Sequence, residues 1–471
     1  MSVLSRSSIT VIAILSLLGC TSLMQKPTQI VAPKSTRSGT KIVAQQPSVH
    51  QAAWWKKMHD PELDHLIALA LAKNNALQSA SANILQAQAQ LQEARFAWLP
   101  TLQATGNGFV GGGWDSHYHP EGSLAAIPGL SKVGSIHFRG YFGGFVPKYS
   151  LNILENIYQN SYATESLAMQ EAMYQSTRIS IISQVSGAYF MLLGQRAQLN
   201  DQRQYLQDLK KIRQLEGSRY RHGASDATII TDLDRQIESD TTNLSSLENS
   251  IAQVENAIQI LLDRNPGPLA QYGDVNHLPV KGLIPANISS EVLKKRPDIL
   301  SAEHNLNMAE AKVGVAYANF FPMLSLTDLV GSSSIEMIHL LKLSTSLWVL
   351  QGAASLPLLN GVSYAQIKEA KAGYLAAYYN YAQTLRSAFA DVDNSLTNQQ
   401  IMYAIYQRQS KALQSAQKSY SLALARYKAG AKDYRDVLNA KLLVDSAKLN
   451  VTLAKMQQLD SIVEVYQSLA M

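Results

Sequence analysis

The sequence contains two copies of one long segment, and this repeat constrains the fold more than any other feature. Residues 219–226 (RYRHGASD) return as residues 426–433 (RYKAGAKD), an offset of 207 residues (430 − 223). Upstream, residues 94–100 (ARFAWLP) are echoed by residues 316–322 (AYANFFP). Two long copies in the same order predict two similar structural units side by side.

Each unit is predicted to contain a helix, two short strands, a very long helix, a tight glycine turn and a returning helix. We expect repeat 1 at 54–275 and repeat 2 at 276–471. Each repeat is expected to begin with a helix, at 62–98 in repeat 1 and at about 289–319 in repeat 2, and Asp60 and Pro61 are typical of the start of the first one. The strand pairs are expected at about 101–147 and 323–356. The helical hairpins are expected at about 151–264 and 362–469. The fold class is therefore mainly α, with long antiparallel helical hairpins.

The longest helices show a sevenfold apolar spacing. Residues 151–216 contain no proline and two glycines, and ~65 helical residues would extend roughly 100 Å. Apolar residues recur every seven positions in both copies: Val185, Leu192, Leu199 and Leu206; Ile237, Leu244, Ile251 and Ile258; Leu442, Leu449, Met456 and Val463. This spacing predicts left-handed coiled-coil packing between antiparallel neighbours. Gly223 and Gly430 allow the left-handed backbone of the turns at the hairpin tips.

The strand segments alternate with period two. Apolar residues and glycines at even positions of 136–146 alternate with His137, Arg139 and Tyr141, and even positions of 102–110 alternate with Gln103 and Thr105. Strands of about 9–11 residues can span a bilayer when tilted, and a soluble hairpin is the alternative. Four strands cannot close a transmembrane barrel, since the smallest common ones have eight. Closure then requires a ring of chains, and three copies give twelve strands and an α-barrel of twelve helical columns.

The N-terminus is typical of a bacterial lipoprotein. Residues 1–19 resemble a signal peptide, with Arg6 before an apolar stretch that is too short to span a bilayer. Cys20, the sole cysteine, follows Leu-Leu-Gly and is the predicted lipidation site. Residues 20–53 are rich in Ser, Thr, Pro and Gln and are expected to form an acylated tether. The alternative is an ordinary signal peptide with a cysteine at that position by chance.

Composition and motifs argue against catalysis and nucleic-acid binding. Charged residues are 16%, and a net charge of +6, partly in the N-terminal segment, gives no basic footprint. No nucleophile elbow, P-loop or zinc-protease motif is present in the sequence. We therefore expect no enzymatic activity, no metal site and no cofactor other than a covalent lipid on Cys20.

Several motifs resemble one family. Residues 295–299 (KRPDI), Ala302-Glu303 and residues 313–322 (VGVAYANFFP) match it most specifically, and Trp54-Trp55, residues 356–361 (LPLLNG) and both Tyr-x-x-Gly tips support the match. The chain resembles the TolC-like outer-membrane efflux proteins, in the lipoprotein branch that includes OprM and NodT. The resemblance covers nearly all of the mature chain, although residues 150–156 (SLNILEN) lack the Gly-Arg that the family usually carries before the long helix.

The resemblance implies a homotrimer in the outer membrane of a Gram-negative bacterium, lipid-anchored and extending into the periplasm. It implies a passive export duct whose tips contact a periplasmic adaptor and an inner-membrane efflux transporter. The tip candidates are Tyr220, Gly223, Ala224, Ser225, Tyr427, Gly430, Ala431 and Lys432. Relatives narrow the periplasmic end with an Asp and an Arg whose positions here are Asn439 and Leu442, so we expect Asp232, Arg435 and Asp436 to shape the constriction, with Asn439 also a gate candidate.

Two alternatives remain open from the residues alone. A structural periplasmic coiled-coil lipoprotein that does not conduct would explain Cys20 and the heptads, but it leaves the two strand pairs unexplained. A channel of the same fold that exports protein or polysaccharide is the other alternative. The exported molecule is not identified, because the pump rather than the shared duct would select it.

Overall fold

The computed structural model describes residues 37, 41–43, 53–113, 136–284, 287–289, 294–334, 346–357 and 359–471. These residues form two compact units. Unit 1 comprises Met1–Ala80, Ala172–Ala302 and Tyr378–Met471, and unit 2 comprises Ser81–Glu171 and Glu303–Ala377. Cys20, the predicted signal peptide and most of the predicted tether lie outside the described residues.

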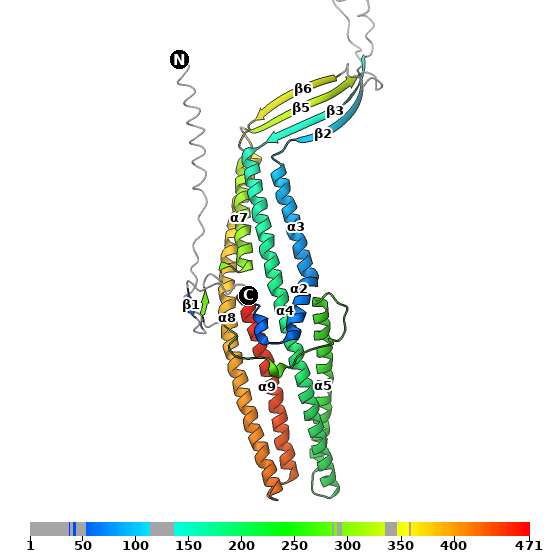
Figure 1. Cartoon of the computed structure of the whole chain (residues 1–471), viewed down its shortest axis with the longest axis vertical. Helices are drawn as coiled ribbons and strands as arrows, with labels where there is room; N and C mark the ends of the chain where they lie inside the picture. The colour runs from blue at the N-terminus through cyan, green and yellow to red at the C-terminus, as the bar shows by residue number, and fades with distance from the viewer. Residues whose placement is uncertain are drawn as a thin grey trace, which may run out of the picture. The chain divides into compact units, whose positions relative to one another are not determined.

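The chain forms two helical hairpins (Figure 1). The first joins α4 (Ile153–Arg221) to α5 (Ala227–Leu261), and the second joins α8 (Gly361–Lys428) to α9 (Tyr434–Ser468). Most of both hairpins lies in unit 1, whereas the first parts of α4 and α8 belong to unit 2. The two compact units therefore do not coincide with the two repeats. The predicted heptad positions face the interior: Val185 and Leu192 of α4 and Ile258 of α5 are fully buried. The sevenfold spacing therefore identified the packed faces of both helices.

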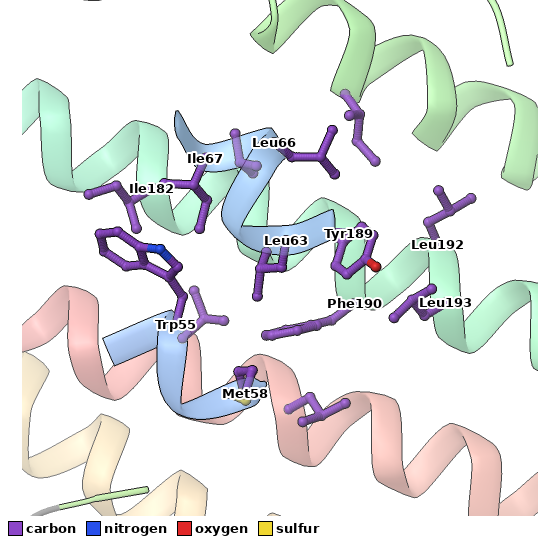
Figure 2. Close-up of a cluster of buried hydrophobic side chains, with 14 of the residues drawn as sticks. Trp55, Met58, Leu63, Leu66, Ile67, Ile182, Tyr189, Phe190, Leu192 and Leu193 are labelled. Carbon is purple, nitrogen blue, oxygen red and sulfur yellow. The ribbon is translucent and has the colours of Figure 1, made fainter. Parts of the chain in front are cut away.

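The main apolar core of unit 1 lies where short N-terminal helices pack on α4. Figure 2 shows side chains from η1 (Trp54–Met58), α2 (Pro61–Lys73) and α4 pointing toward one another. Leu63, Phe190 and Leu192 have no exposed surface. Trp54 stacks on Tyr466 of α9 with ring centroids 4.7 Å apart, so the core also fixes the end of the second hairpin.

Asp60 caps α2 and also joins it to α4. Its Oδ1 accepts the backbone N–H groups of Glu62 and Leu63 at 3.0 and 3.2 Å, which confirms the predicted N-cap. Its Oδ2 accepts the hydroxyl of Tyr189 at 2.9 Å, and that hydroxyl accepts the N–H of Gly273 at 2.8 Å. Burial, together with the nearby carboxylate, raises the pKa of Tyr189, so this phenol remains a hydrogen-bond donor at physiological pH.

The predicted helices at 62–98 and 289–319 are wrong in their extent. The first is two helices, α2 and α3 (Asn75–Phe96), because the side chain of Asn74 accepts the N–H of Ala76 at 2.9 Å and so caps a new start. The second is α7 (Pro297–Ala318), whose first residue, a proline, has the φ of a helix start. Ser289, where the helix was predicted to begin, is instead the last residue of strand β4 (Asn287–Ser289), which pairs in parallel with β1 (Lys41–Val43).

Arg296, just before α7, links the C-terminal end of α9 to α8 by hydrogen bonds. Its guanidinium is 8% exposed and donates to the carbonyls of Ala388 and Ser468 at 3.2 and 2.6 Å. It also pairs with Asp298 at 2.8 Å. Ser468 is the last residue of α9, and a buried cation there is stabilised by the helix dipole and by a carbonyl at the helix end.

Unit 2 contains a four-stranded antiparallel sheet in the order β2-β3-β5-β6. The strands are β2 (Thr101–Gly113), β3 (Ile136–Leu151), β5 (Met323–Ser334) and β6 (Ser346–Ser355). Asn152 follows β3 and caps α4: its side chain accepts the N–H of Glu155 at 3.2 Å and donates to the Glu155 carboxylate at 2.8 Å. This reciprocal cap stands where the family's usual Gly-Arg is missing.

The register of the sheet corrects the predicted division into apolar and polar faces. Ala104 pairs with Phe145, Phe145 with Val330, and Val330 with Trp348. Opposite residues of antiparallel strands share a face, so the even positions of β2 lie with the odd positions of β3. Phe145, Val330 and Trp348 are 56%, 46% and 75% exposed in the single chain. An apolar row therefore crosses the sheet, which no single strand's alternation reveals.

Among the helices that the structure describes, none combines the length and the apolar character needed to cross a membrane.

Phe190→Ala should lower the free energy of unfolding of unit 1 by about 3–5 kcal/mol, because it leaves a cavity among fully buried side chains. The neighbouring substitution Met191→Ala is the matched control, since Met191 is 42% exposed. It should change stability by about 0.5 kcal/mol or less. Thermal unfolding in detergent, followed by circular dichroism, checks the difference, and equal midpoints for the two variants would contradict it.

Candidate functional site: the hairpin tips

The two hairpin tips have the same backbone geometry, as their repeated sequence predicts. Gly223 and Gly430 have φ values of 73° and 72°, in the left-handed region that glycine adopts without strain. The next residue donates back across each turn: Ala224 N–H to Arg219 at 2.8 Å, and Ala431 N–H to the carbonyl of Arg426 at 2.9 Å. These contacts complete the ends of α4 and α8 and reverse the chain within a few residues.

Asp226 and Asp433, which are equivalent in the repeat, cap the returning helices. Asp226 accepts the N–H of Thr228 at 2.9 Å, and Asp433 accepts the N–H of Arg435 at 3.2 Å. These backbone hydrogen bonds are the largest cause that lowers the pKa of each carboxyl, so both are ionised at neutral pH. The N-cap of each returning helix is therefore the aspartate and not the residue before it, Ser225 or Lys432.

A buried carboxylate joins the two tips. Glu216 of α4 has a side chain that is only 1% exposed. Its carboxylate accepts the hydroxyl of Ser225 and lies 3.9 Å from Nε of Arg219 and 3.6 Å from Nε of Arg435. Arg219 also pairs with Asp433. We call these five residues the tip cluster: Glu216, Arg219, Ser225, Asp433 and Arg435.

Further from the tips, α4 and α9 are joined by more polar contacts. Lys441 of α9 lies 3.4 Å from Oδ2 of Asp208 on α4 and also pairs with Asp445. Thr452 of α9 donates to Asp201 of α4 at 3.1 Å. We call this line of contacts, from the tip cluster to the Asp201–Thr452 hydrogen bond, the α4–α9 seam.

The charges of the tip cluster explain why it can hold two hairpins together. A buried carboxylate needs cations and hydrogen-bond donors in place of its water shell. Ser225 donates to Oε2 of Glu216, and Arg219 and Arg435 lie at ion-pair distance, while Oε1 is buried and accepts no hydrogen bond. Removing one partner of such a group typically costs about 3–5 kcal/mol, because the remaining charge stays buried and unpaired. Arg435 comes from the other hairpin, so separating the tips breaks its ion pair with Glu216, and the hydration that Glu216 then gains offsets part of this loss.

The predicted gate residues are not gathered in one cluster within the described chain. Arg435 contacts Glu216, whereas Asp436 pairs with Lys432 at 3.3 Å. Asp232 lies on α5 with a side chain that is 76% exposed, 3.9 Å from Arg235 of the same helix. Asn439 is exposed on α9. A constriction would be formed by several neighbouring chains, so the role of these residues in it stays a prediction.

The predicted tip residues do lie at the turns. Ala224, Ala431 and Lys432 are exposed. Tyr220 is 49% exposed and Tyr427 is 42% exposed, and the Tyr427 ring lies 5.3 Å from that of Tyr434 across the turn. That contact agrees with a bracing role for Tyr427. Adaptor contact by any tip residue remains a prediction.

Sequence reasoning missed Glu216, the centre of the tip cluster. A signal was present, because Leu209, Ile212 and Glu216 follow the spacing of three and four residues that buries one helix face. All three are buried, at 2%, 4% and 1% exposure. A charged residue on an otherwise apolar stripe indicates a paired buried charge. Within the described residues, no group of three or more His, Cys, Asp or Glu side chains is arranged to hold a metal ion.

The model of the family described as "Outer membrane efflux protein" matches residues 155–263 and 288–471. These two segments include most of both hairpins. The chain belongs to the outer membrane efflux protein family. The predicted resemblance and the predicted combination of long helical hairpins with a small four-stranded sheet are thereby confirmed. This family consists of efflux channels rather than enzymes, which agrees with the predicted lack of enzymatic activity.

Individual relatives agree with the family assignment. The chain is 27% identical over 425 residues to the probable efflux pump outer membrane protein TtgC of Pseudomonas putida, covering 89% of this chain and 85% of that protein. It is 28% identical over 440 residues to the probable outer membrane lipoprotein SilC of Salmonella typhimurium, covering 92% and 91%. The solved open state of the MtrE outer membrane channel of Neisseria gonorrhoeae superposes with a TM-score of 0.79 at 26% identity, covering 95% and 97%.

Asp226→Ala and Asp433→Ala form a matched pair that isolates the bridge between the tips. Each loses an N-cap, which costs about 1 kcal/mol, but only Asp433→Ala also releases Arg219. Hydrogen exchange should therefore accelerate in the first turn of α5 in one variant and of α9 in the other. Only Asp433→Ala should also accelerate exchange at the end of α4. Equal protection of that segment in both variants would contradict the bridge.

Proposed function

We propose that this efflux protein is the outer-membrane duct of a tripartite system, through which small molecules leave passively. An inner-membrane transporter would supply the energy, and a periplasmic adaptor would contact the hairpin tips. The observation that carries the proposal is the combination, in one chain, of an open sheet with an apolar row and two helical hairpins with charged tips. TtgC is named as part of an efflux pump, which supports the same role here.

The open sheet supports a homotrimer. Strands β2 and β6 are the outer strands of the sheet in the described residues, so each has one side without a strand partner. Unpaired backbone groups are not tolerated in lipid, and a ring of chains would pair β2 of one chain with β6 of the next. Three chains give twelve strands, within the range of known transmembrane barrels. The apolar row of Phe145, Val330 and Trp348 is suited to contact with lipid.

The contacts at the hairpin tips support the proposal of a gate at the periplasmic end. The tip cluster holds the two hairpins of one chain together through Arg219 and Arg435, which lie on different hairpins. In a threefold ring, Asp232, Asp436 and Asn439 would recur three times around the periplasmic end, where repeated carboxylates attract cations. Opening would require the α4–α9 seam to part. The solved MtrE channel is described as an open state, so a relative of this fold can be open.

Localisation follows from the family and from the N-terminal sequence. The outer membrane is the location named for TtgC and SilC, and SilC is named as a lipoprotein. A lipid on Cys20 would anchor the chain while the helical hairpins extend into the periplasm. The residue after Cys20 is Thr21 rather than Asp, which differs from the usual inner-membrane retention signal.

In planar bilayers, the purified protein should conduct as a trimer, and Glu216→Ala should raise the open probability about tenfold or more. A loss of about 1.4 kcal/mol of closed-state stability is enough for a tenfold change, and Glu216 is the carboxylate with which Arg435 of the other hairpin pairs. Glu238→Gln, which changes an exposed charge of α5, is the control and should leave conductance unchanged.

Three results would contradict parts of this proposal. A monomer that does not conduct would exclude the duct and favour a structural lipoprotein. Normal conductance with no effect of Glu216→Ala would leave the duct and exclude the tip cluster as a lock. Unchanged conductance in both Asp232→Ala and Asp436→Ala would exclude these two carboxylates from the constriction.

Cells that express the protein should incorporate labelled palmitate into it, and Cys20→Ser should abolish the label, because Cys20 is the sole cysteine. The unsubstituted chain should sediment with the outer membrane. Label that survives Cys20→Ser would refute the lipid anchor without affecting the assignment to the efflux family.

A further inference from the structure

Two buried carboxyl groups face the contact between α4 and α9, above the tip cluster in the seam. The side chain of Asp208 on α4 is 4% exposed and that of Asp445 on α9 is 1% exposed. Lys441 lies 3.4 Å from Oδ2 of Asp208 and pairs with Oδ1 of Asp445, so the two buried carboxyls share one cation. Two ionised carboxylates on one cation repel each other, and a proton on either of them would relieve that repulsion.

The donors around the pair are distributed unequally. Asp208 accepts hydrogen bonds from Lys211 at 2.7 Å and from Gln204 at 2.8 Å, and Nζ of Lys441 lies 3.4 Å from its Oδ2. Asp445 has Lys441 on its Oδ1, while its Oδ2 is buried and accepts no hydrogen bond. A buried acceptor without a donor is costly, and a proton on this carboxyl would remove that cost by turning an acceptor into a donor. Asp445 is therefore the member of the pair that is suited to bind the proton.

Other titratable groups near the pair come from three helices. On α4 they are Asp201, Tyr205 and Lys211; on α9 they are Tyr434, Lys441 and Lys448; and on α5 it is Asp240, which acts on Tyr205. Lys441 lies between the two carboxyls, and its pKa is raised despite the opposing effect of its burial, because Asp445 and Asp208 favour its charged form. It therefore stays protonated, and the group of this cluster that is suited to gain a proton on acidification is the Asp445 carboxyl.

We propose that Asp208 and Asp445 form a proton-binding site that holds α4 against α9 more tightly when the periplasm becomes acidic. A proton from solvent binds the Asp445 carboxylate, and the resulting carboxyl donates a hydrogen bond to Asp208. When α4 and α9 part, water reaches Asp445 and the proton dissociates. This regulation rests on the proposed function, in which parting of the seam opens the duct.

The direction of the pH effect follows from the pKa shifts. Burial is the main cause that raises the pKa of Asp445 in the closed seam; Lys441 lowers it, and Asp208 raises it by a smaller effect. The closed seam is thus favoured below the ordinary pKa of Asp and loses this contribution as the pH rises through the raised value. Burial opposes ionisation of Asp208, but hydrogen bonds from Lys211, Gln204 and Asp445 lower its pKa to about 2, so it stays ionised. Acidification from neutral pH to about pH 4 therefore tightens the seam.

Infrared spectroscopy tests the proton directly. As the pH falls, the full-length protein in detergent should show a carboxylic-acid carbonyl band that grows in already above the pH range of an ordinary Asp. Asp445→Asn should remove this band, and Glu238→Gln should leave it. A band that appears only near the ordinary Asp pKa, or that persists in Asp445→Asn, would overturn the proton site whether or not the protein conducts.

The tip separation tests the consequence. Spin labels on Ala224→Cys and Ala431→Cys, in a Cys20→Ser background and diluted with unlabelled chains, report the distance between the two tips of one chain. The separated fraction should fall several-fold between about pH 7.5 and about pH 5, since a one-unit pKa shift changes such a ratio by up to about tenfold. Asp445→Asn, which resembles the protonated carboxyl, should stay closed at both pH values.

A second substitution distinguishes an effect on the proton site from simple misfolding. Lys441→Gln removes the cation that opposes protonation and should move the midpoint of closure to higher pH. A separation that does not depend on pH in the unsubstituted chain, or a pH response that is unchanged in Asp445→Asn, would overturn the inference. If the tips respond to pH but the trimer does not conduct, the proton site stands and the proposed duct fails.

Discussion

Two helices of 69 and 68 residues cannot be buried in a globular core, so other helices must cover them along their length. That constraint governs unit 1. Around Phe190 and Leu192, which are fully buried, α4 is covered by apolar side chains of η1 and α2. Toward the tips, the contact between α4 and α9 consists of charged and polar groups around Glu216 and Asp208. The same helix therefore has an apolar part and a polar part.

The polar seam has a physical consequence that an apolar one would not have. An apolar contact loses about 25 cal/mol for each Å² exposed when it opens. A buried ion pair gains hydration when it opens, and this gain offsets much of the lost Coulomb energy. Contacts such as Glu216–Arg435 and Asp208–Lys441 thus hold the hairpins in register without making their separation prohibitive. Such a balance suits an element that must part and close again.

Local patterns in the sequence predicted much of this architecture because they depend on near neighbours. Gly223 and Gly430 marked the tips, Asp60 marked a helix start, and the heptads of α4 marked its packed face. The errors arose where a distant contact overrode the local pattern. Asn74 ends α2 partly because its side chain donates to the carbonyl of Leu261, and residues 287–289 form a strand because β1 supplies a partner.

The sequence alone determined the repeat, the long hairpins and the turn chemistry, since each follows from residues close together along the chain. Only the tertiary structure decided which side chains meet across the helices. Glu216 reaches Arg435, and Asp208 reaches Lys441, across more than two hundred residues of chain. Such pairs depend on how far each helix is rotated about its axis and shifted along its neighbour, and helical periodicity leaves both open. The same applies to the sheet, where the register rather than the alternation places Phe145 beside Val330 and Trp348 on one face.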